Sequence, residues 1–542
     1  MVTTQQPLLY TPKTNFSYCK AAKTLCIILS LAAIVGPITL ASIKLINYGF
    51  SSSSSSLSAH IRDPVHHPVS SYNVKSLQMI LQQSALSIKN TLEMAKNLNR
   101  RINDQREAAA LSDCLELMDL IMDRVMDSMV ALENLTAQSH FDVHAWLSSV
   151  LTNHVTCMDG LNGPSRPIME PWLNELISRA RTSLAAVVAV APPPPTEEEF
   201  WQWSLVGEFP EWVTGSDRKL LKSLPKGVKA NVTVAQDGSG NYRTIREAVA
   251  SAPDNYKNRY VIYVKKGKYK ENVVIGKNKK NIMLVGDGMS STIITGSLNF
   301  VDGQTILQSA TVAVLGDGFI AQDIWFQNTA GPVKRQAVAL RVGAHKSVIN
   351  RCRIEGYQDT LYAHCLCQFY RDCYITGTID FIFGDAAVVL QNCRLVLRKP
   401  MTGQQNVIAA QGRTDPNQNT GTSIQNCDIR AGSDLEPVKG LVKSYLGRPW
   451  KQYSRTVVME SNIGNLIDPA GWLEMNGTFA LETLYYGEYL NRGPGAGTIK
   501  RVNWKGYHQA LSEAEASKFT VANLIQGGAW LKSTGVAYTE GL

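Results

Sequence analysis

The sequence lacks the motifs of the protein class that its charge first suggests. Its formal net charge is +9, from 54 basic and 45 acidic residues. An excess of positive charge favours polyanionic partners, and nucleic acid is the usual first candidate. The chain contains no helix-turn-helix, zinc-finger or RNP pattern. We therefore expect no nucleic-acid partner, and an acidic polysaccharide fits the same charge.

Charged residues are also scarce, at 18% of the chain, against 44% hydrophobic residues. These values are typical of globular proteins rather than disordered ones, and 542 residues exceed one ordinary domain. Residues 1–221 carry 17 basic and 20 acidic residues (net −3), whereas residues 222–542 carry 37 and 25 (net +12). The second part of the chain therefore holds the excess of basic charge.

Charge is absent from residues 24–43. Twenty apolar-rich residues match the ~30 Å hydrocarbon thickness of a bilayer. Three lysines precede this stretch and only one follows closely, which predicts a cytoplasmic tail over residues 1–23 and entry of the rest into the secretory lumen. We see no clear small-residue cleavage site and favour an uncleaved signal-anchor over a cleaved signal peptide. A Ser-rich stalk over residues 44–75 follows.

The secretory route makes disulfides and glycans permissible. Two of the ten cysteines lie in or before the apolar stretch, which leaves eight. Sequons occur at Asn134, Asn231 and Asn476. We predict that these three asparagines are glycosylation sites.

Residues 76–191 carry the pattern of a small helical bundle. Apolar residues recur at spacings of three and four, as in the series Leu111, Leu115, Met118, Met122, Val125. Such stripes bury one face of each helix, so a four-helix bundle is expected. Cys114 and Cys157 lie on two of these helices, and a disulfide between them is open.

Residues 192–221 are predicted to be a linker. Four consecutive prolines end the helical pattern. A dibasic motif, SDRKLL, follows at residues 216–221, which makes Arg218, Lys219, Leu220 and Leu221 a candidate processing site. A solvated charge pair explains the same residues from their spacing alone.

From residue 231 the pattern changes to short β-rich runs separated by Gly, Asn and Asp. A weak repeat aligns five of these runs, with spacings of 29, 21, 20 and 34 residues between its marker residues Asp323, Cys352, Cys373, Cys393 and Cys427. Short strands at such periods mark a solenoid. Long helical patterns between the strands are missing, which argues against βαβ units. We expect an all-β, right-handed parallel β-helix; a β-propeller is the alternative, but its blade period of ~40–50 residues is too long.

In a parallel β-helix, equivalent residues stack on adjacent coils. Cys373 and Cys393 are one coil apart, which gives them a reason to form a disulfide. Cys352 and Cys427 are expected to be small buried core residues.

Two aspartates stand in apolar, aromatic segments, GYQDTLY (356–362) and GTIDFIFG (377–384). Asp359 and Asp380 are 21 residues apart, which is one coil of the inferred period, so they should project side by side. Paired carboxylates divide nucleophile and acid/base roles when their environments separate their pKa values. From the period alone, however, ordinary turn aspartates explain them better.

The segment from about Ala230 to Leu542 resembles the catalytic domain of plant pectinesterases. The resemblance rests on GSGNYRTIREAV, QAVAL, GYQDTLY, DFIFG, QGRTDPNQNTG, LGRPW and GPGAGT. Residues 76–191 resemble the inhibitor-like pro-region of the same family, through SDCLELMD, DVHAWLSSVLTNHVTCMDG and the RKLL linker. The resemblance places the catalytic domain at residues 222–542 and implies hydrolysis of the methyl esters of homogalacturonan, which yields methanol and pectate.

The resemblance also implies a role for each residue of the matching motifs. Asp380 would attack the ester carbonyl, and Asp359 would protonate the departing methanol and then deprotonate the hydrolytic water. Gln336 and Gln358 would donate to the oxyanion, a stabilisation of ~3 kcal/mol per donor. Arg448 would keep Asp380 ionised. The remaining substrate contacts would be Trp450, stacked on a sugar face, and Tyr362 and Phe383 as walls of the cleft.

This chemistry needs no metal or organic cofactor. His364, Cys365 and Cys367 in AHCLC suggest a metal site, but structural zinc needs four ligands, usually in two clusters, and no second cluster is evident. We expect a monomer whose partners are pectin, a processing protease at RKLL and a proteinaceous pectinesterase inhibitor. Its site of action would be the cell wall, reached through a membrane-anchored precursor whose pro-region is autoinhibitory.

Three departures from the family pattern lie near the cleft. Asp385 replaces the usual Asn, Ile306-Leu307 replace a Thr-Phe pair, and Cys365 and Cys367 are extra. They leave one alternative function open, an attenuated esterase that acts as a pectin-binding or inhibitory wall protein. A polygalacturonase is a second alternative, since it also uses aspartates, but the QAVAL glutamine and the LGRPW arginine argue against it.

Overall fold

The computed structural model describes residues 73–190 and 229–542. All of these residues belong to one compact unit, Ser71–Leu542. The predicted membrane segment, nearly all of the stalk and the RKLL site lie outside the described residues. Within the two described ranges, no helix is long and apolar enough to cross a membrane.

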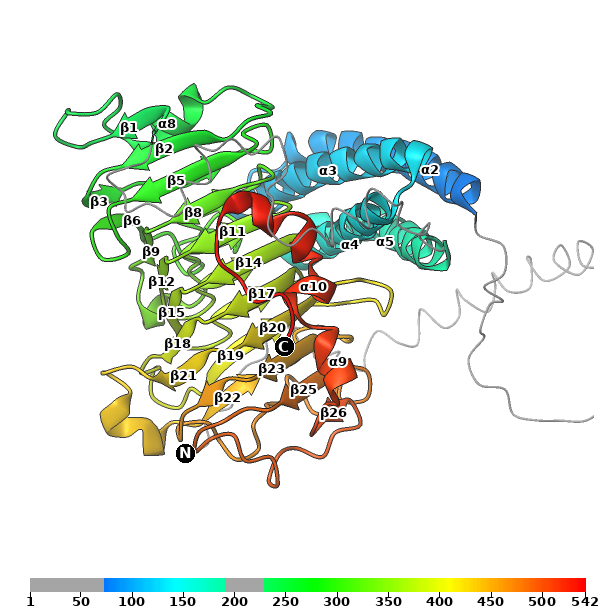
Figure 1. Ribbon diagram of the computed structural model, residues 1–542. Helices are drawn as coiled ribbons and strands as arrows, with labels where there is room; N and C mark the ends of the chain where they lie inside the picture. Colours follow the sequence, from blue (N-terminus) through cyan, green and yellow to red (C-terminus); the bar gives the residue numbers. More distant parts are fainter. Residues whose placement is uncertain (1–72, 191–228) are drawn as a thin grey trace, which may run out of the picture. The chain divides into compact units, whose positions relative to one another are not determined.

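Four packed helices form the first part of this unit (Figure 1). Their bounds are α2 (Val74–Asn99), α3 (Gln105–Ala131), α4 (Ala137–Gly160) and α5 (Ser165–Ala189), with the short η1 (Leu132–Asn134) after α3. Three of the helices have an N-cap residue whose side chain accepts a hydrogen bond from a backbone N–H of the first turn. These N-cap residues are Asn73, Asp104 and Thr136. The predicted apolar stripes are buried, which confirms the four-helix bundle.

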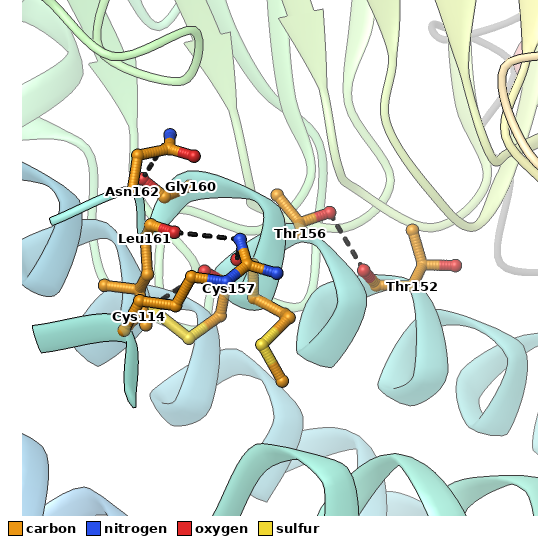
Figure 2. The surroundings of a disulfide bond; sticks show 9 residues. Cys114, Thr152, Thr156, Cys157, Gly160, Leu161 and Asn162 are labelled. Atoms are coloured by element: carbon orange, nitrogen blue, oxygen red, sulfur yellow. Dashed lines mark hydrogen bonds between the residues drawn. A yellow bond between two sulfur atoms is a disulfide. The ribbon is translucent and has the colours of Figure 1, made fainter. Parts of the chain in front are cut away.

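One disulfide ties two helices of the bundle together. Cys114 of α3 and Cys157 of α4 are bonded, with a Cα–Cα distance of 4.8 Å. Figure 2 shows the bond beside Thr152 and Thr156, which lie one turn apart on α4. Cross-links that close loops of this length stabilise mainly by restricting the unfolded chain. The bridge left open by the sequence is therefore present.

The second part consists of three parallel sheets whose strands alternate along the chain, coil after coil (Figure 1). Sheet A comprises β1 (Val232–Val234), β2 (Tyr260–Val264), β5 (Ile282–Gly286), β8 (Ile320–Gln322), β11 (Ser347–Asn350), β14 (Cys367–Arg371), β17 (Ala387–Gln391), β20 (Gly421–Gln425), β23 (Arg455–Met459), β25 (Tyr485–Tyr489) and β26 (Tyr507–His508). Sheet B comprises β3 (Gly267–Lys270), β6 (Thr292–Gly296), β9 (Trp325–Asn328), β12 (Arg353–Glu355), β15 (Tyr374–Gly377), β18 (Arg394–Leu397), β21 (Asp428–Ala431) and β24 (Asn462–Ile463). Sheet C comprises β4 (Val273–Ile275), β7 (Val312–Val314), β10 (Leu340–Val342), β13 (Leu361–Ala363), β16 (Ile382–Gly384), β19 (Asn406–Gln411) and β22 (Ser444–Gly447). This arrangement confirms the parallel β-helix.

Short helices close the β-helix. The first coil carries α8 (Ile245–Ser251), whose Ala248 and Val249 join the main core. The C-terminal segment, with α9 (Glu513–Ser517), α10 (Val521–Leu524), η5 (Gly527–Ala529) and η6 (Leu531–Thr534), packs Phe519 and Leu531 onto the outer face of sheet A. The loops contribute η3 (Pro332–Lys334) and η4 (Glu436–Leu441). These additions leave the outer face of sheet C for other contacts.

The observed register corrects the repeat alignment by one residue. Val348 pairs with Ile320 and Asn350 with Gln322, so Cys352 corresponds to Ile324 and Asp323 corresponds to Arg351. Asp323 and Arg351 both have positive φ, 58° and 48°, because the sharp turn from sheet A to sheet B needs one left-handed residue. Cys352 and Ile324 follow that turn and point into the core.

The predicted Cys373–Cys393 disulfide is wrong, since both cysteines are free. Their sulfurs contact backbone carbonyl groups and are not bonded to each other. The Cys373 thiol donates to the carbonyl of Ile349 at 3.2 Å, and the Cys393 thiol donates to that of Gln391 at 3.5 Å. Cys352 and Cys427 are buried core residues, as expected. The four cysteines thus continue a stack inside the coil.

Candidate active site

The two aspartates stand at equivalent positions of neighbouring coils on sheet C. Asp359 precedes β13 and Asp380 precedes β16, and the register Leu361↔Ile382 carries the same 21-residue offset. Both have positive φ, 59° and 50°, and both side chains are buried. Positive φ is unusual for a residue other than glycine and concentrates at functional sites. The adjacency predicted from the spacing is therefore present.

Arg448 binds Asp380 through two hydrogen bonds. Its Nε donates to Asp380 Oδ1 at 2.8 Å and its Nη2 to Oδ2 at 2.5 Å. This two-pronged geometry is the strong form of a guanidinium–carboxylate pair. Although burial alone lowers the pKa of Arg448, the Asp380 carboxylate raises that pKa above its usual range. The contact gives Asp380 a positively charged partner that Asp359 lacks among the described residues.

Asp359 has the opposite environment. Burial raises the pKa of this carboxyl well above its usual range, the charge of Asp380 raises it further, and Arg448 offsets only part of the effect. Two adjacent carboxyl groups cannot easily both ionise in a buried site. The pair therefore combines Asp380, which is bound by a guanidinium, with Asp359, whose raised pKa favours the protonated form. Such separated states are what a nucleophile and a general acid require.

Two glutamines lie beside the pair. Gln336 precedes β10 and is buried, and among the described residues its Oε1 has no hydrogen-bond partner. Gln358 directly precedes Asp359 and is half-buried. The backbone N–H of Ala337 donates to the Gln358 carbonyl at 3.3 Å, which ties the two segments together. A buried amide without a full set of partners is able to receive a substrate atom.

An aromatic column continues the site along the outer face of sheet C. The register places Tyr362 of β13 beside Phe383 of β16 and Arg341 of β10 beside Tyr362. The Tyr362 and Phe383 rings are stacked, with centroids 4.2 Å apart, and Trp450 meets Phe383 edge-on at 5.8 Å. The three predicted aromatic residues therefore form one continuous surface.

The helical bundle covers this surface. Tyr362, Phe383 and Trp450 pack in one hydrophobic cluster with residues of α2 to α5. A cavity of about 560 Å³ remains beside the cover, lined by Tyr362 and Trp450 but by neither Asp359 nor Asp380. The bundle therefore covers the aromatic column beside the pair, and a cavity remains next to Tyr362 and Trp450.

Ion pairs join the bundle to the β-helix, and most of them pair a bundle carboxylate with a β-helix cation. They are Glu116–Arg341 at 3.1 Å, Asp119–Lys277 and Asp123–Lys277 at 2.8 Å, Asp142–Lys346 at 2.9 Å and Asp159–Lys451 at 2.6 Å, with Arg124–Asp317 at 2.6 Å and Arg181–Asp415 at 3.6 Å in the reverse sense. Asp142 also lies 3.1 Å from the ring of His345, a residue whose pKa is lowered by burial. The uneven charge of the sequence thus reappears across this interface.

Asp385 belongs to the interface as well. Gln411 Nε2 donates to its Oδ1 at 3.0 Å, and Gln418 Nε2 donates to its Oδ2 at 2.6 Å. Both amides are locked in orientation because their own oxygens accept backbone N–H groups, for example those of Arg413 and Thr414. Thr152 of α4 and Thr420 add contacts at 2.6 and 2.5 Å. The carboxylate matches a ring of donors that an asparagine cannot satisfy.

The other departures also lie against the bundle. Ile306 packs on the shared cluster, and the His364 ring contacts Thr156 Oγ1 at 3.2 Å. Cys365 and Cys367 are buried and free. In the described part of the chain, no group of three or more His, Cys, Asp or Glu side chains is arranged to hold a metal ion. All three sequon asparagines, Asn134, Asn231 and Asn476, are exposed, as glycosylation requires, and their occupancy stays a prediction.

One charged residue next to the aromatic column was not singled out from the sequence. Arg341 lies on the outer face of sheet C between the inward-facing Leu340 and Val342, and its side chain is 3% exposed. The alternation of apolar and charged residues in a predicted strand was the signal that could have found it.

Known proteins resemble this chain closely. Residues 231–528 match the family described as Pectinesterase, and residues 50–189 match the plant invertase/pectin methylesterase inhibitor family. A pectinesterase/pectinesterase inhibitor of Ficus pumila var. awkeotsang is 60% identical over 86% of each chain. One from Arabidopsis thaliana is 52% identical over the full length of both. A solved structure of pectin methylesterase from carrot is 58% identical, covers 58% of this chain and 99% of its own, and superposes with a TM-score of 0.58.

Proposed function

Because the chain belongs to the pectinesterase family, we propose that its hydrolysis of pectin methyl esters is carried out by the Asp359–Asp380 pair beneath a removable inhibitory bundle. The activity itself, release of methanol from pectin, follows from the family. The observation that carries the proposed roles is the bidentate contact of Arg448 with Asp380, beside an Asp359 that has no such partner among the described residues.

In the first half-reaction, an Asp380 carboxylate oxygen attacks the ester carbonyl carbon of a methylated galacturonate. The carbonyl oxygen becomes an oxyanion, which the amide N–H groups of Gln336 and Gln358 stabilise. As the intermediate collapses, the bond to the methoxy oxygen breaks and Asp359 donates its proton to that oxygen. Methanol leaves, and the galacturonyl group remains joined to Asp380 as a mixed anhydride.

In the second half-reaction, Asp359 is a carboxylate and serves as the base. It takes a proton from water, and the hydroxide oxygen attacks the galacturonyl carbon. The bond to Asp380 breaks, so Asp380 is a carboxylate again, Asp359 is protonated again, and the galacturonyl group leaves as a carboxylic acid that loses its proton to water. Arg448 stabilises the departing Asp380 carboxylate, and Trp450, Tyr362 and Phe383 hold the sugar ring.

Two substitutions test these roles in full-length protein that has been cut in the linker. Asp380→Asn is expected to abolish methanol release from pectin, since an amide is not a nucleophile here. Asp359→Asn is expected to lower kcat by about 10²–10⁴. Activity of Asp380→Asn equal to that of the unaltered protein would refute the assignment.

The bundle is proposed to be autoinhibitory, with cleavage at Arg218–Leu221 as the step that permits its release. The support is its packing over Tyr362, Phe383 and Trp450. An uncleavable Arg218→Ala chain should release methanol more slowly than cut protein. Equal rates would contradict autoinhibition.

The setting of the reaction is proposed in the same way. Plant pectinesterases act in the cell wall, which the chain would reach through the secretory route, with residues 24–43 anchoring the precursor in a membrane. A processing protease at RKLL and a separate inhibitor protein, bound where the bundle now lies, are the proposed protein partners. Detection of the anchored precursor in a membrane fraction would test the route.

A further inference from the structure

We propose that Arg341, flanked by Lys277 and Lys451, forms a binding row for the free carboxylates of de-esterified galacturonate, and that the bundle acids occupy this row as substitutes for that polyanion. The inference rests on the pectinesterase function above and adds a ligand for residues outside the catalytic pair.

The position of Arg341 is the first argument. It faces outward on β10, and the register sets it one strand away from Tyr362, a separation of about 4.8 Å. Its other neighbours in the outward column are Ala313 of β7 and, beyond Tyr362, Phe383. Among these four outward positions Arg341 is the charged one, and the next two, Tyr362 and Phe383, each lie three residues after one of the two aspartates.

The incomplete pairing of Arg341 is the second argument. The Arg341 side chain is 3% exposed, while its partner Glu116 is 44% exposed. Among the described residues, Glu116 makes the only ion pair with Arg341, through Nη2, and the buried Nε has no partner. Burying a guanidinium is costly unless its charge and donors are satisfied. One half-exposed bundle carboxylate meets that requirement poorly, which indicates a site shaped for another anion.

The order of the cations is the third argument. Lys277 follows β4 and is held by Asp119 and Asp123, and Lys451 follows β22 and is held by Asp159. These strands are the two ends of sheet C, with β13 and β16 between them. Six strand spacings separate the ends, about 29 Å. A row of that length suits several consecutive units of an anionic polymer and not a single small anion.

Mutual exclusion follows from shared contacts. Once the bundle leaves, Arg341 and the two lysines lose their carboxylate partners, and the free carboxylates of de-esterified pectin present the same chemistry. The product of the reaction should therefore bind next to the catalytic pair and compete with the bundle. Released protein should prefer partly de-esterified pectin over fully methylated pectin.

The test uses full-length protein with an engineered protease site at residues 218–221, cut after purification. The cut protein is diluted until the bundle has dissociated. Under these conditions Arg341→Gln is expected to lower kcat/KM about tenfold on pectin of low methylation. On fully methylated pectin it should remain within about twofold. Arg394→Gln is the matched control, because Arg394 lies exposed on sheet B, and it should change neither value. The proposal is overturned if the ratio of kcat/KM on pectin of low methylation to kcat/KM on fully methylated pectin is the same for Arg341→Gln as for the unaltered protein. This includes the case in which the variant loses the same factor on both substrates.

A second variant covers the case in which Arg341→Gln fails to fold. Glu116→Gln leaves the guanidinium in place and removes its bundle partner. Polygalacturonate should displace this bundle at about tenfold lower concentration than the unaltered bundle, and the substrate ratio should not change. If the polygalacturonate concentration that displaces half of the bundle does not change, the bundle acids and the polymer do not compete for Arg341, and the proposal is contradicted. If the unaltered cut protein released no methanol from either pectin, the proposed function would fail instead.

Discussion

Replacing Asp142 by asparagine should loosen the bundle by an amount that the structure predicts. Asp142 of α4 accepts a hydrogen bond from Lys346 Nζ at 2.9 Å, and its carboxylate lies 3.1 Å from His345 Nε2. Burial raises the pKa of this carboxyl, but His345 and Lys346 outweigh burial and bring the pKa from 3.8 to about 2. Asparagine keeps the shape of the neutral carboxyl at every pH and so removes only the charge.

The sign and size follow from proton linkage. A carboxyl whose pKa is depressed in the closed state stabilises that state above its ordinary pKa, and the contribution is lost as pH falls towards the depressed value. With the ordinary pKa in the released bundle, the shift from 3.8 to about 2 corresponds to about 2–2.5 kcal/mol, or roughly 60-fold in the dissociation constant near pH 5. At pH 3 the same linkage predicts that Asp142→Asn raises the dissociation constant of the bundle only about tenfold.

The assay measures methanol release by linker-cut protein over a dilution series, which reports the dissociation constant of the bundle. Asp142→Asn should raise that constant relative to unaltered protein, and the ratio should shrink between pH 5 and pH 3. Titrating groups that do not contact Asp142 affect both proteins alike and cancel in the ratio. Glu133→Gln, at an exposed position of η1, is the control. A ratio below about threefold at pH 5, or one that grows on acidification, would refute the reasoning.

The remaining predictions concern three other contacts. Arg448→Lys removes one of the two parallel hydrogen bonds to Asp380 and should lower kcat about 100-fold with little change in KM in methanol-release kinetics; an unchanged kcat would contradict the role of the bidentate pair. Asp385→Asn places an amide N–H against the N–H group of either Gln411 or Gln418, and it should lower the free energy of unfolding by about 2 kcal/mol in denaturant unfolding. Equal denaturation midpoints for the two proteins would show that these donors reorient. Alkylation without reduction should label Cys373 and Cys393 in the unfolded chain, and a peptide linking the two would contradict the thiol stack.

Much of the architecture was predictable because it depends on periods. The stripes at spacings of three and four gave the bundle, and the recurrence of short β-rich runs gave the parallel β-helix. The 21-residue spacing of Asp359 and Asp380 equals the strand register, so their adjacency was also predictable. The repeat alignment was wrong by one residue at Asp323, because the marker chosen there was the turn residue and not the inward residue after it.

Contacts between distant segments were not predictable. Stacking on adjacent coils made a Cys373–Cys393 bond plausible, but proximity does not say whether two sulfurs face each other or a carbonyl group. The partnership of Arg341 with Glu116 joins residues 225 positions apart, and no local pattern encodes it. Asp385 was noticed as a departure, yet its meaning depends on donors from Gln418 and Thr152 that only the folded chain brings together.

The shared hydrophobic cluster of the bundle and the aromatic column has a consequence for processing. While the linker is intact, the bundle faces the column at an effective concentration that reaches the millimolar range. A single cut removes none of the packing around Tyr362 and Phe383, but it turns closure into a bimolecular equilibrium. Proteolysis would then not switch the enzyme on by itself; it would make the fraction of active molecules depend on dilution, so that spreading away from the site of secretion becomes the activating event.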